Sequence, residues 1–250
     1  MTAEEILAVH EHRPFPIPAS AWIFWQEWHD LLFAHWRVPV QVIRRAVPAQ
    51  LELDLWQGEA YVGVVPFLLH NFRPRYCPSI PVLSHFPEIN VRTYVSYKGI
   101  PGVYFFSLDA ANLSAVLGAR FAYALPYFHA RFEIRKNMEE IHYYSHRLQR
   151  PKTADFCGRY RPISEVHPWQ PPEQSLERFL AERYCLYAVT KSHVYRTAVH
   201  HLPWPLQSAS AQIELNTMAA PFGLSLQSPP ALLHFSRSMF VLTWLPQRVD

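Results

Sequence analysis

The stretch FPEINVRTYVSYKGIPGVYFFSLDA, residues 86–110, contains two strand-like runs joined by a short turn. Asn90–Tyr97 and Val103–Leu108 are rich in β-branched and aromatic residues, which favour strands. Tyr97-Lys98-Gly99 between them is typical of a tight hairpin turn. Asp109 is a candidate N-cap, and apolar residues at helical spacing predict a helix over Ala110–Tyr123. The stretch therefore predicts an antiparallel hairpin that leads into a helix.

Strands and turns of the same kind recur along the whole chain. Its 23 prolines, against only 7 glycines, keep the regular segments short. Turns are expected at Arg135-Lys136-Asn137 and at Lys191-Ser192. Further strands are predicted at Tyr61–Leu69, Phe128–Arg135, Glu140–His146, Leu186–Thr190, Val194–His201 and Leu232–Leu245. This pattern predicts an α+β fold that is mainly β.

Helices are expected to be few. Ser175 is a candidate cap for a helix over Leu176–Arg183, and Ser208 precedes a possible helix over Ala209–Ala219. A third, short helix is expected within Val38–Leu51. Tyr160–Gln174 is proline-rich and is interpreted as a long surface loop inside one domain. We therefore expect residues 1–20 to form an N-terminal tail and residues 21–250 a single domain.

Composition excludes several classes of protein. Half of the residues are hydrophobic, 15% are aromatic and 17% are charged, which is typical of a globular chain. The net charge of +3 comes without a basic run, so no nucleic-acid partner is expected. The N-terminus lacks the features of a signal peptide, and no apolar run approaches the roughly 20 residues that span a bilayer. The sequence thus predicts a cytoplasmic protein without a membrane partner, and leaves a homo-oligomer open.

Cysteine and histidine spacing argues against a metal site. Cys77, Cys157 and Cys185 lie far apart, which indicates reduced and mostly buried thiols. His200 and His201 are neighbours on a predicted strand and so point to opposite faces. No nucleotide-binding or hydrolase motif is present, and neither a metal nor a cofactor is expected.

Three segments resemble acetoacetate decarboxylases: VPAQLELD (47–54), the stretch 86–110 and GARFAYALPYF (118–128). Other segments resemble more closely the uncharacterised bacterial DUF2071, or YqjF-like, family of the same superfamily. They include WHDLLFAHWRVP (28–39), YVGVVPF (61–67), ERYCLY (182–187), HHLPWPLQ (200–207) and LLHFSRSM (232–239). The resemblance implies a curved or closed antiparallel sheet around an internal pocket, with a few flanking helices.

The resemblance also indicates which chemistry is missing. In acetoacetate decarboxylases, the first lysine after a proline forms an imine with the substrate, and a second lysine lowers its pKa. The corresponding positions here are Tyr127 and Phe128, which supply neither an amine nor a cation. The chain has four lysines, at positions 98, 136, 152 and 191, and all fall in predicted turns or loops, where lysines are usually solvated. Decarboxylation through an imine is therefore not expected.

Glu88 is the strongest candidate for a functional residue, because it matches the pocket carboxylate of the superfamily. In a regular strand, Asn90, Arg92 and Tyr94 share its face. Glu88 and Arg92 form either a pocket pair or a structural ion pair. A nearby arginine would lower the pKa of the carboxyl and favour a base over an acid. The further pocket candidates are Arg120, Tyr127 and His129.

Three hypotheses follow. The first is a pocket protein that binds a small carbonyl, carboxylate or aromatic compound. The second is a lysine-independent lyase or hydrolase with Glu88 as base, Arg92 and Arg120 as anion holders and Tyr127 as hydrogen-bond donor. The third is a structural or interaction protein whose core is filled.

Overall fold

A computed structural model describes residues 1–113, 123–138, 140–149, 154–164, 172, 174–191 and 193–250. The helical elements are α1 (Ala3–Ala8), α2 (Val40–Ala46), α3 (Pro81–Ser84), α5 (Leu176–Ala181) and the 3-10 turn η1 (Ala220–Phe222). The strands are β1 (Phe24–Val38), β2 (Glu52–Leu53), β3 (Ala60–Pro74), β4 (Phe86–Tyr97), β5 (Ile100–Ala110), β6 (Tyr127–Asn137), β7 (Glu140–Arg147), β8 (Asp155–Pro162), β9 (Cys185–Thr190), β10 (His193–His200), β11 (Gln207–Asn216), β12 (Leu232–Thr243) and β13 (Gln247–Arg248).

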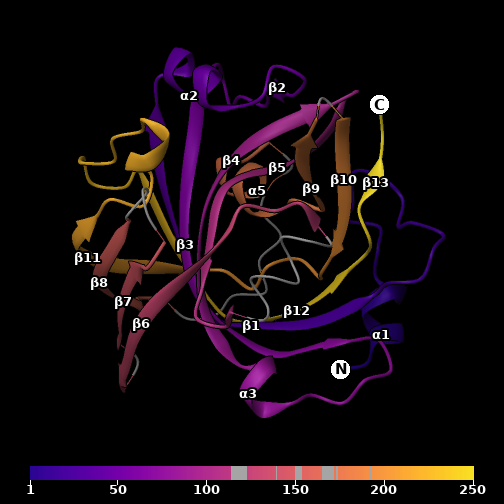
Figure 1. The fold of residues 1–250 in the computed structure, drawn as a ribbon, viewed down its shortest axis with the longest axis horizontal. Coiled ribbons are helices and arrows are strands. Elements are labelled where there is room, and N and C mark those ends of the chain that lie inside the picture. The colour runs from indigo at the N-terminus through magenta and orange to yellow at the C-terminus, as the bar shows by residue number, and fades with distance from the viewer. Residues whose placement is uncertain (114–122, 139, 150–153, 165–171, 173, 192) are drawn as a thin grey trace.

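The sheet closes on itself in two rings that share one wall (Figure 1). In the nine-strand ring, β5, β6, β7, β8, β11 and β12 continue into β1, β3 and β4, and β4 returns to β5. In the seven-strand ring, β9 and β10 replace β6, β7, β8 and β11, because β10 also pairs with β12. Most neighbours are antiparallel, but β5 is parallel to both β6 and β9. The predicted closed sheet is confirmed, with these parallel contacts added.

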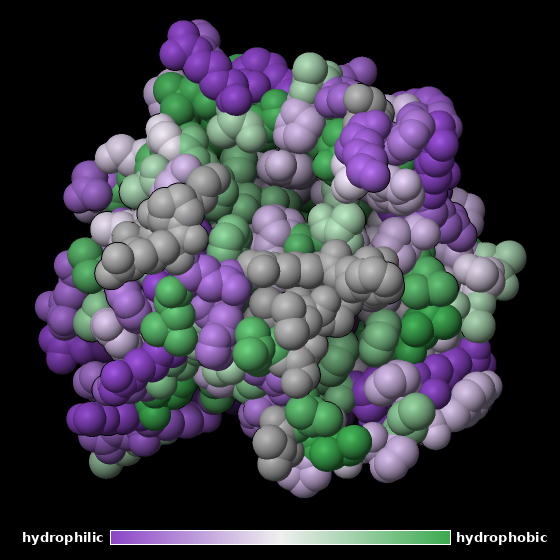
Figure 2. Space-filling model, viewed as in Figure 1, coloured by the Kyte–Doolittle hydropathy of each residue, from purple (hydrophilic) through white to green (hydrophobic). Residues whose placement is uncertain are grey.

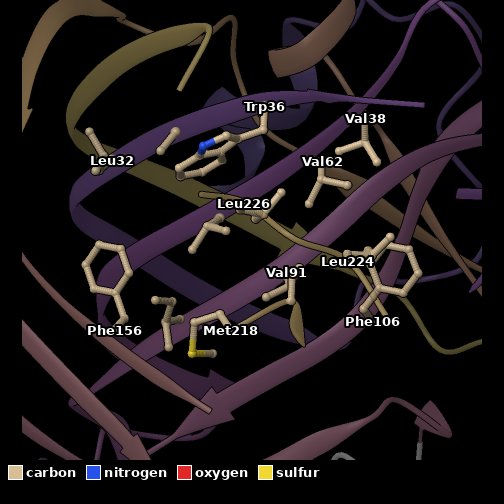
Figure 3. Packing of buried hydrophobic residues seen from close by; sticks show 14 of the residues in the cluster. Leu32, Trp36, Val38, Val62, Val91, Phe106, Phe156, Met218, Leu224 and Leu226 are labelled. Carbon is tan, nitrogen blue, oxygen red and sulfur yellow. The ribbon is translucent and has the colours of Figure 1, made fainter. Parts of the chain in front are cut away.

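Five strands, β12, β1, β3, β4 and β5, belong to both rings. The three central ones, β1, β3 and β4, are buried on both faces, and adjacent residues enter different cores. Ile89 and Val91 pack with Ile141 and Phe156 in the nine-strand lobe, where Figure 3 shows the packed side chains. Phe86 and Tyr94 belong instead to the core of the seven-strand lobe. Because both of its faces are covered, β3 contains a near-continuous apolar run from Ala60 to Leu69.

The expected hairpin after β4 is confirmed. Lys98 and Gly99 form its turn with φ values of 51° and 75°, and Tyr97 pairs with Ile100. The capping role of Asp109 is wrong, because the strand continues through Asp109 to Ala110. Residues 114–122, which make up most of the predicted helix, lie outside the described part of the chain.

Two helices expected elsewhere match the structure, and one prediction fails. Ser175 caps α5 through its side chain, and α2 lies within the expected range. The helix predicted over Ala209–Ala219 is wrong, since strand β11 occupies most of that range. Its alternating buried and exposed residues pair with β8, so tertiary pairing decides its conformation. Of the thiols expected to be buried, only Cys185 is; Cys77 is exposed and Cys157 is partly exposed.

The alternation predicted along β10 is confirmed, and it separates two environments. The N-terminal segment covers one face: Arg13 donates to the carbonyl of Val199 at 2.7 Å, and its Nη1 lies 3.1 Å from His200 Nδ1. Thr197, Val199 and His201 point to the interior of the seven-strand ring. Among the helices that the structure describes, none has the length and hydropathy needed to cross a membrane.

Candidate functional site

A cavity of about 720 Å³ occupies the seven-strand ring. All seven strands of the ring contribute to its wall, which is mostly apolar. The cavity reaches the surface beside α3, where the lining residues Ile80 and Leu83 are 52% and 43% exposed. Figure 2 shows hydrophobic side chains at the lower edge of this face, where Figure 1 places α3. The hollow interior contradicts the hypothesis of a filled core.

Three alternating residues of β4 place polar groups in this apolar cavity. Glu88, Asn90 and Arg92 line it, and they are only 3%, 6% and 7% exposed. Val65 of β3 and Leu108 of β5 are register partners of Asn90 and flank it with apolar side chains. Strand alternation, as predicted, thus puts one carboxyl, one amide and one guanidinium on the cavity side.

Glu88 lies near the end of the cavity that is also lined by Tyr127. The hydroxyl of Tyr127 donates to Glu88 Oε2 at 3.2 Å. On the opposite face of the wall, the hydroxyl of Tyr143 donates to the main-chain oxygen of Glu88 at 2.7 Å and fixes the backbone. Burial raises the pKa of Glu88 to about 8, and the hydrogen bond from Tyr127 opposes this shift only in part. Glu88 is therefore mostly protonated at pH 7.

A second carboxyl group reinforces the protonated state of Glu88. Asp109 faces the other lobe and is held by two hydrogen bonds from Arg147, at 2.6 and 2.7 Å, with both side chains fully buried. Burial raises the pKa of Asp109, whereas its bonds from Arg147 lower it. The negative charge of Asp109 adds to burial in raising the pKa of Glu88.

Arg92 occupies a different part of the cavity. One of its guanidinium nitrogens donates to the main-chain oxygen of Leu180 at 3.2 Å, and the guanidinium lies over the Phe33 ring, 5.1 Å from its centroid. Within the described residues, Arg92 makes no ion pair with a carboxylate, and its Nε has no hydrogen-bond partner. A buried, uncompensated cation is costly, so this position favours an anionic ligand.

Helix α5 closes the cavity near Arg92. The hydroxyl of Tyr94 also donates to the oxygen of Leu180, at 3.0 Å, so two side chains of β4 hold the end of this helix. Because that proton is used, the Tyr94 oxygen accepts from Nε2 of His35 at 2.6 Å. Burial lowers the pKa of His35 well below its usual value, which keeps the imidazole neutral. Tyr94 therefore positions α5 and does not line the cavity.

The other predicted site residues have mixed outcomes. Tyr127 lines the cavity, whereas His129 is half-buried and does not. Arg120 lies outside the described residues. Glu88 and Arg92, both described, do not pair with each other, and the expected lowering of the Glu88 pKa is wrong. The reason is that Arg92 directs its guanidinium to Leu180, so that burial dominates at Glu88.

Sequence reasoning missed several groups that line the cavity, among them Arg183, His201 and Trp204. Arg183 donates to Asp54 and to the main-chain oxygen of Phe179, so its charge is compensated. Burial lowers the pKa of His201 to about 4, which makes it neutral. The alternation of β10 was a signal for His201. Arg183 lies in the short connection between α5 and β9, and Trp204 lies in the connection between β10 and β11, where no sequence period marks a residue.

The described lysines all lie away from the cavity. Lys98 donates to the main-chain oxygen of Val249 at 2.8 Å, and Lys136 pairs with Asp30 at 2.7 Å. Lys191 is exposed, and Lys152 falls outside the described residues. In the part of the chain that the structure covers, no three histidine, cysteine or acidic side chains are grouped to hold a metal ion.

Comparisons with solved structures support the fold. An acetoacetate decarboxylase from Legionella pneumophila superposes with a TM-score of 0.62 at 12% identity, covering 95% of this chain and 93% of that one. An acetoacetate decarboxylase-like enzyme from Sphingomonas wittichii gives a TM-score of 0.63 at 11% identity, covering 95% and 98%. The enduracididine biosynthesis enzyme MppR complexed with pyruvate gives 0.59 at 12%, covering 96% and 93%. At these identities the likeness concerns the fold alone.

Sequence comparisons are more specific. The uncharacterized protein YqjF of Bacillus subtilis (strain 168) is 45% identical over 234 residues, which cover 94% of this chain and 96% of YqjF. The profile of DUF2071, described as an uncharacterized conserved protein, matches residues 25–239. The chain therefore belongs to the DUF2071 family, within an acetoacetate decarboxylase-like fold.

Proposed function

We propose that this protein binds a small organic anion with an apolar body inside the seven-strand ring, with the anionic group on Arg92. The observation that carries the proposal is the buried guanidinium of Arg92, which has no carboxylate partner among the described residues and faces an apolar cavity. A carboxylate there would supply the missing charge, and the aliphatic and aromatic walls would bury the rest of the molecule.

The size of the cavity supports a ligand of modest size. About 720 Å³ lies within the usual range of roughly 300–1,000 Å³ for small-molecule sites. MppR, a structural neighbour, has been solved in complex with pyruvate, a small oxo acid. Carried to this chain, that chemistry makes carboxylates and oxo acids the first probes to try.

The proposal does not include an imine step. Tyr127 stands where the resemblance places the reactive lysine, and it donates a hydrogen bond to Glu88. None of Lys98, Lys136 and Lys191 lines the cavity. The pocket is thus proposed to hold its ligand by charge and burial rather than by a covalent bond to an amine.

A second candidate function is catalysis with Glu88 as a general acid. It is favoured by the neutral carboxyl, whose pKa of about 8 suits proton donation near pH 7. Glu88 would give its proton to a carbonyl oxygen as negative charge develops there and would recover it from the product or from water. This reverses the role of base that the sequence predicts.

Isothermal titration with phenylpyruvate, an aromatic oxo acid, tests the binding function. The wild-type protein is expected to bind it, and Arg92→Met should weaken binding at least tenfold because the charge is lost. Methionine fills a similar volume, and replacing an unpaired buried charge by an apolar group should not destabilise the fold. Arg131→Met is the matched control, because Arg131 is exposed, pairs with Glu133 and does not line the cavity.

Two outcomes would contradict the proposal. One is unchanged affinity in Arg92→Met, which would place the anion elsewhere. The other is the absence of binding by phenylpyruvate and by a panel of aliphatic and aromatic carboxylates to the folded wild-type protein. Conversion of a bound probe by wild-type protein but not by Glu88→Gln would support the catalytic candidate.

A further inference from the structure

We propose that the ligand of this cavity has two polar ends, an anionic group held by Arg92 and an uncharged hydrogen-bond acceptor, such as a ketone oxygen, held by Glu88. This inference rests on the proposed anion site at Arg92 and adds a second contact at the other end of the molecule. The class of ligand is therefore an elongated monoanionic oxo acid with an apolar middle.

The spacing along β4 sets the separation of the two ends. Glu88 and Arg92 are four residues apart on one strand, which places their Cα atoms about 13 Å apart. Leucine and valine side chains lie between them, because Leu108 and Val65 flank the intervening Asn90 and line the cavity. An apolar segment of the ligand would contact these side chains.

The two ends lie in different surroundings. Arg92 contacts the end of α5 through Leu180, which closes the cavity there. Glu88 contacts Tyr127 and, by register, lies opposite Phe67 and Ala110, at the end of β4 that follows α3. Because the cavity opens beside α3, the anionic end of the ligand would lie deeper and the carbonyl end nearer the mouth.

The hydrogen bonds of Glu88 determine what it can offer a ligand. Oε2 already accepts from the hydroxyl of Tyr127, so we assign the proton of the neutral carboxyl to Oε1, the oxygen that is left for the ligand. An O–H group on Oε1 requires an acceptor, and a ketone oxygen is one. A second carboxylate would have to enter beside Glu88 and near the negative charge of Asp109, so a dianion is disfavoured.

The unpartnered polar atoms of the cavity support a built site rather than an empty gap in the packing. Among the described residues, Oδ1 of Asn90, Nε of Arg92 and Nε1 of Trp204 are buried without hydrogen-bond partners, and all three residues line the cavity. Buried polar atoms are rarely left unsatisfied in folded proteins. Side chains that line the cavity thus carry polar atoms whose hydrogen bonds the described part of the protein does not supply.

Matched pairs of acids test the inference by titration calorimetry. Pyruvate and propanoate, levulinate and pentanoate, and 7-oxooctanoate and octanoate each differ mainly by one ketone oxygen, at an increasing distance from the carboxylate. The ketone should strengthen binding about two- to tenfold in the longest pair, as expected for one hydrogen bond, and leave the pyruvate pair unchanged. Glu88→Met should abolish that gain while octanoate still binds.

Should Glu88→Met fail to fold, Tyr127→Phe provides a second variant, because it keeps the carboxyl of Glu88 and removes the hydrogen bond to it. This variant should change the increase in affinity that the ketone gives 7-oxooctanoate over octanoate, but not the affinity for octanoate itself. Glu133→Gln is the control and should match wild type, because Glu133 is exposed and does not line the cavity. Equal affinity of octanoate and 7-oxooctanoate for the wild type, or an equal gain in Glu88→Met, would overturn the two-ended ligand while leaving the anion site intact. Failure of all six acids to bind, or unchanged octanoate affinity in Arg92→Met, would instead overturn the proposed function.

Discussion

The two lobes share five strands, β12, β1, β3, β4 and β5, as a common wall, yet one lobe is filled and the other is hollow. In the nine-strand lobe, aromatic and aliphatic side chains pack together, and the buried hydroxyls of Tyr143 and Tyr160 both donate to main-chain oxygens. In the seven-strand lobe, Glu88, Asn90 and Arg92 face open volume. A sheet with two buried faces can thus pack one face closely and line a cavity with polar groups on the other.

Alternation along β4 makes this division possible. Ile89 and Val91 enter the filled lobe, whereas Glu88, Asn90 and Arg92 enter the hollow one. A register shift of one residue would exchange the two sets and bury three polar groups in the packed core. The hydrogen bond from Tyr143 to the main-chain oxygen of Glu88 joins the lobes at this point and opposes such a shift.

The largest expected effect on the free energy of unfolding comes from truncating a phenylalanine to alanine on each side of the shared wall. Phe156→Ala in the filled lobe should lower the free energy of unfolding by about 3–5 kcal/mol, because it leaves a cavity in a close-packed core. Phe105→Ala borders the existing cavity, where the ring is only partly buried, and should cost clearly less. Urea unfolding of both variants measures the difference, and equal losses would contradict the division between the lobes.

The next effect is a pH dependence of stability that originates in the hollow lobe. Burial raises the pKa of Glu88 from 4.5 to about 8, so the folded protein keeps a proton that the unfolded chain releases above pH 4.5. The free energy of unfolding therefore falls by about 1.4 kcal/mol per pH unit between these values. Glu88→Gln removes this slope and should be more stable than wild type by about 3 kcal/mol at pH 7. Glu133→Gln should keep the wild-type slope, and parallel profiles for all three proteins would refute the assignment.

The affinity for a ligand should follow the same titration of the Glu88 carboxyl, with a smaller effect than on stability. Above pH 8, Glu88 becomes negative and loses the proton that it would donate. The affinity for 7-oxooctanoate should therefore fall above pH 8, by at most about tenfold per pH unit. Calorimetry at pH 6, 7, 8 and 9 measures the decline. A constant affinity over this range would show that Glu88 does not face the bound molecule.

The smallest expected effect concerns the bond that joins the two lobes. Tyr143→Phe removes the hydroxyl that donates to the main-chain oxygen of Glu88 and should lower the free energy of unfolding by about 1 kcal/mol. It should also weaken octanoate binding only slightly, since the ring remains packed in the filled lobe. A loss of binding as large as that of Arg92→Met would mean that the wall itself is reorganised.

Sequence reasoning succeeded where local periodicity controls the structure. The hairpin at Lys98 and Gly99 follows from turn chemistry, and the cavity row of Glu88, Asn90 and Arg92 follows from strand alternation. It failed for β1, which was not predicted, because β1 has neither a regular alternation nor the continuous apolar run of β3. It also failed for β11, whose strand conformation depends on pairing with β8, a partner distant in sequence.

The protonation state of Glu88 could not be predicted from the sequence for a related reason. Arg92 lies close in sequence and predicts a lowered pKa, but its guanidinium turns to α5, which is formed by residues 176–181. The dominant influence is burial within a ring that only the complete chain closes. Charge proximity in sequence therefore gave the wrong sign, whereas the resemblance to the superfamily picked out Glu88, which does line the cavity.

The most direct test of the central claim is a crystal structure of the protein with octanoate bound. We expect the carboxylate of octanoate within hydrogen-bond distance of the Arg92 guanidinium, and its alkyl chain running past Asn90 towards Glu88 and the mouth beside α3. Octanoate bound outside the seven-strand ring, or in the ring with its carboxylate away from Arg92, would contradict the account.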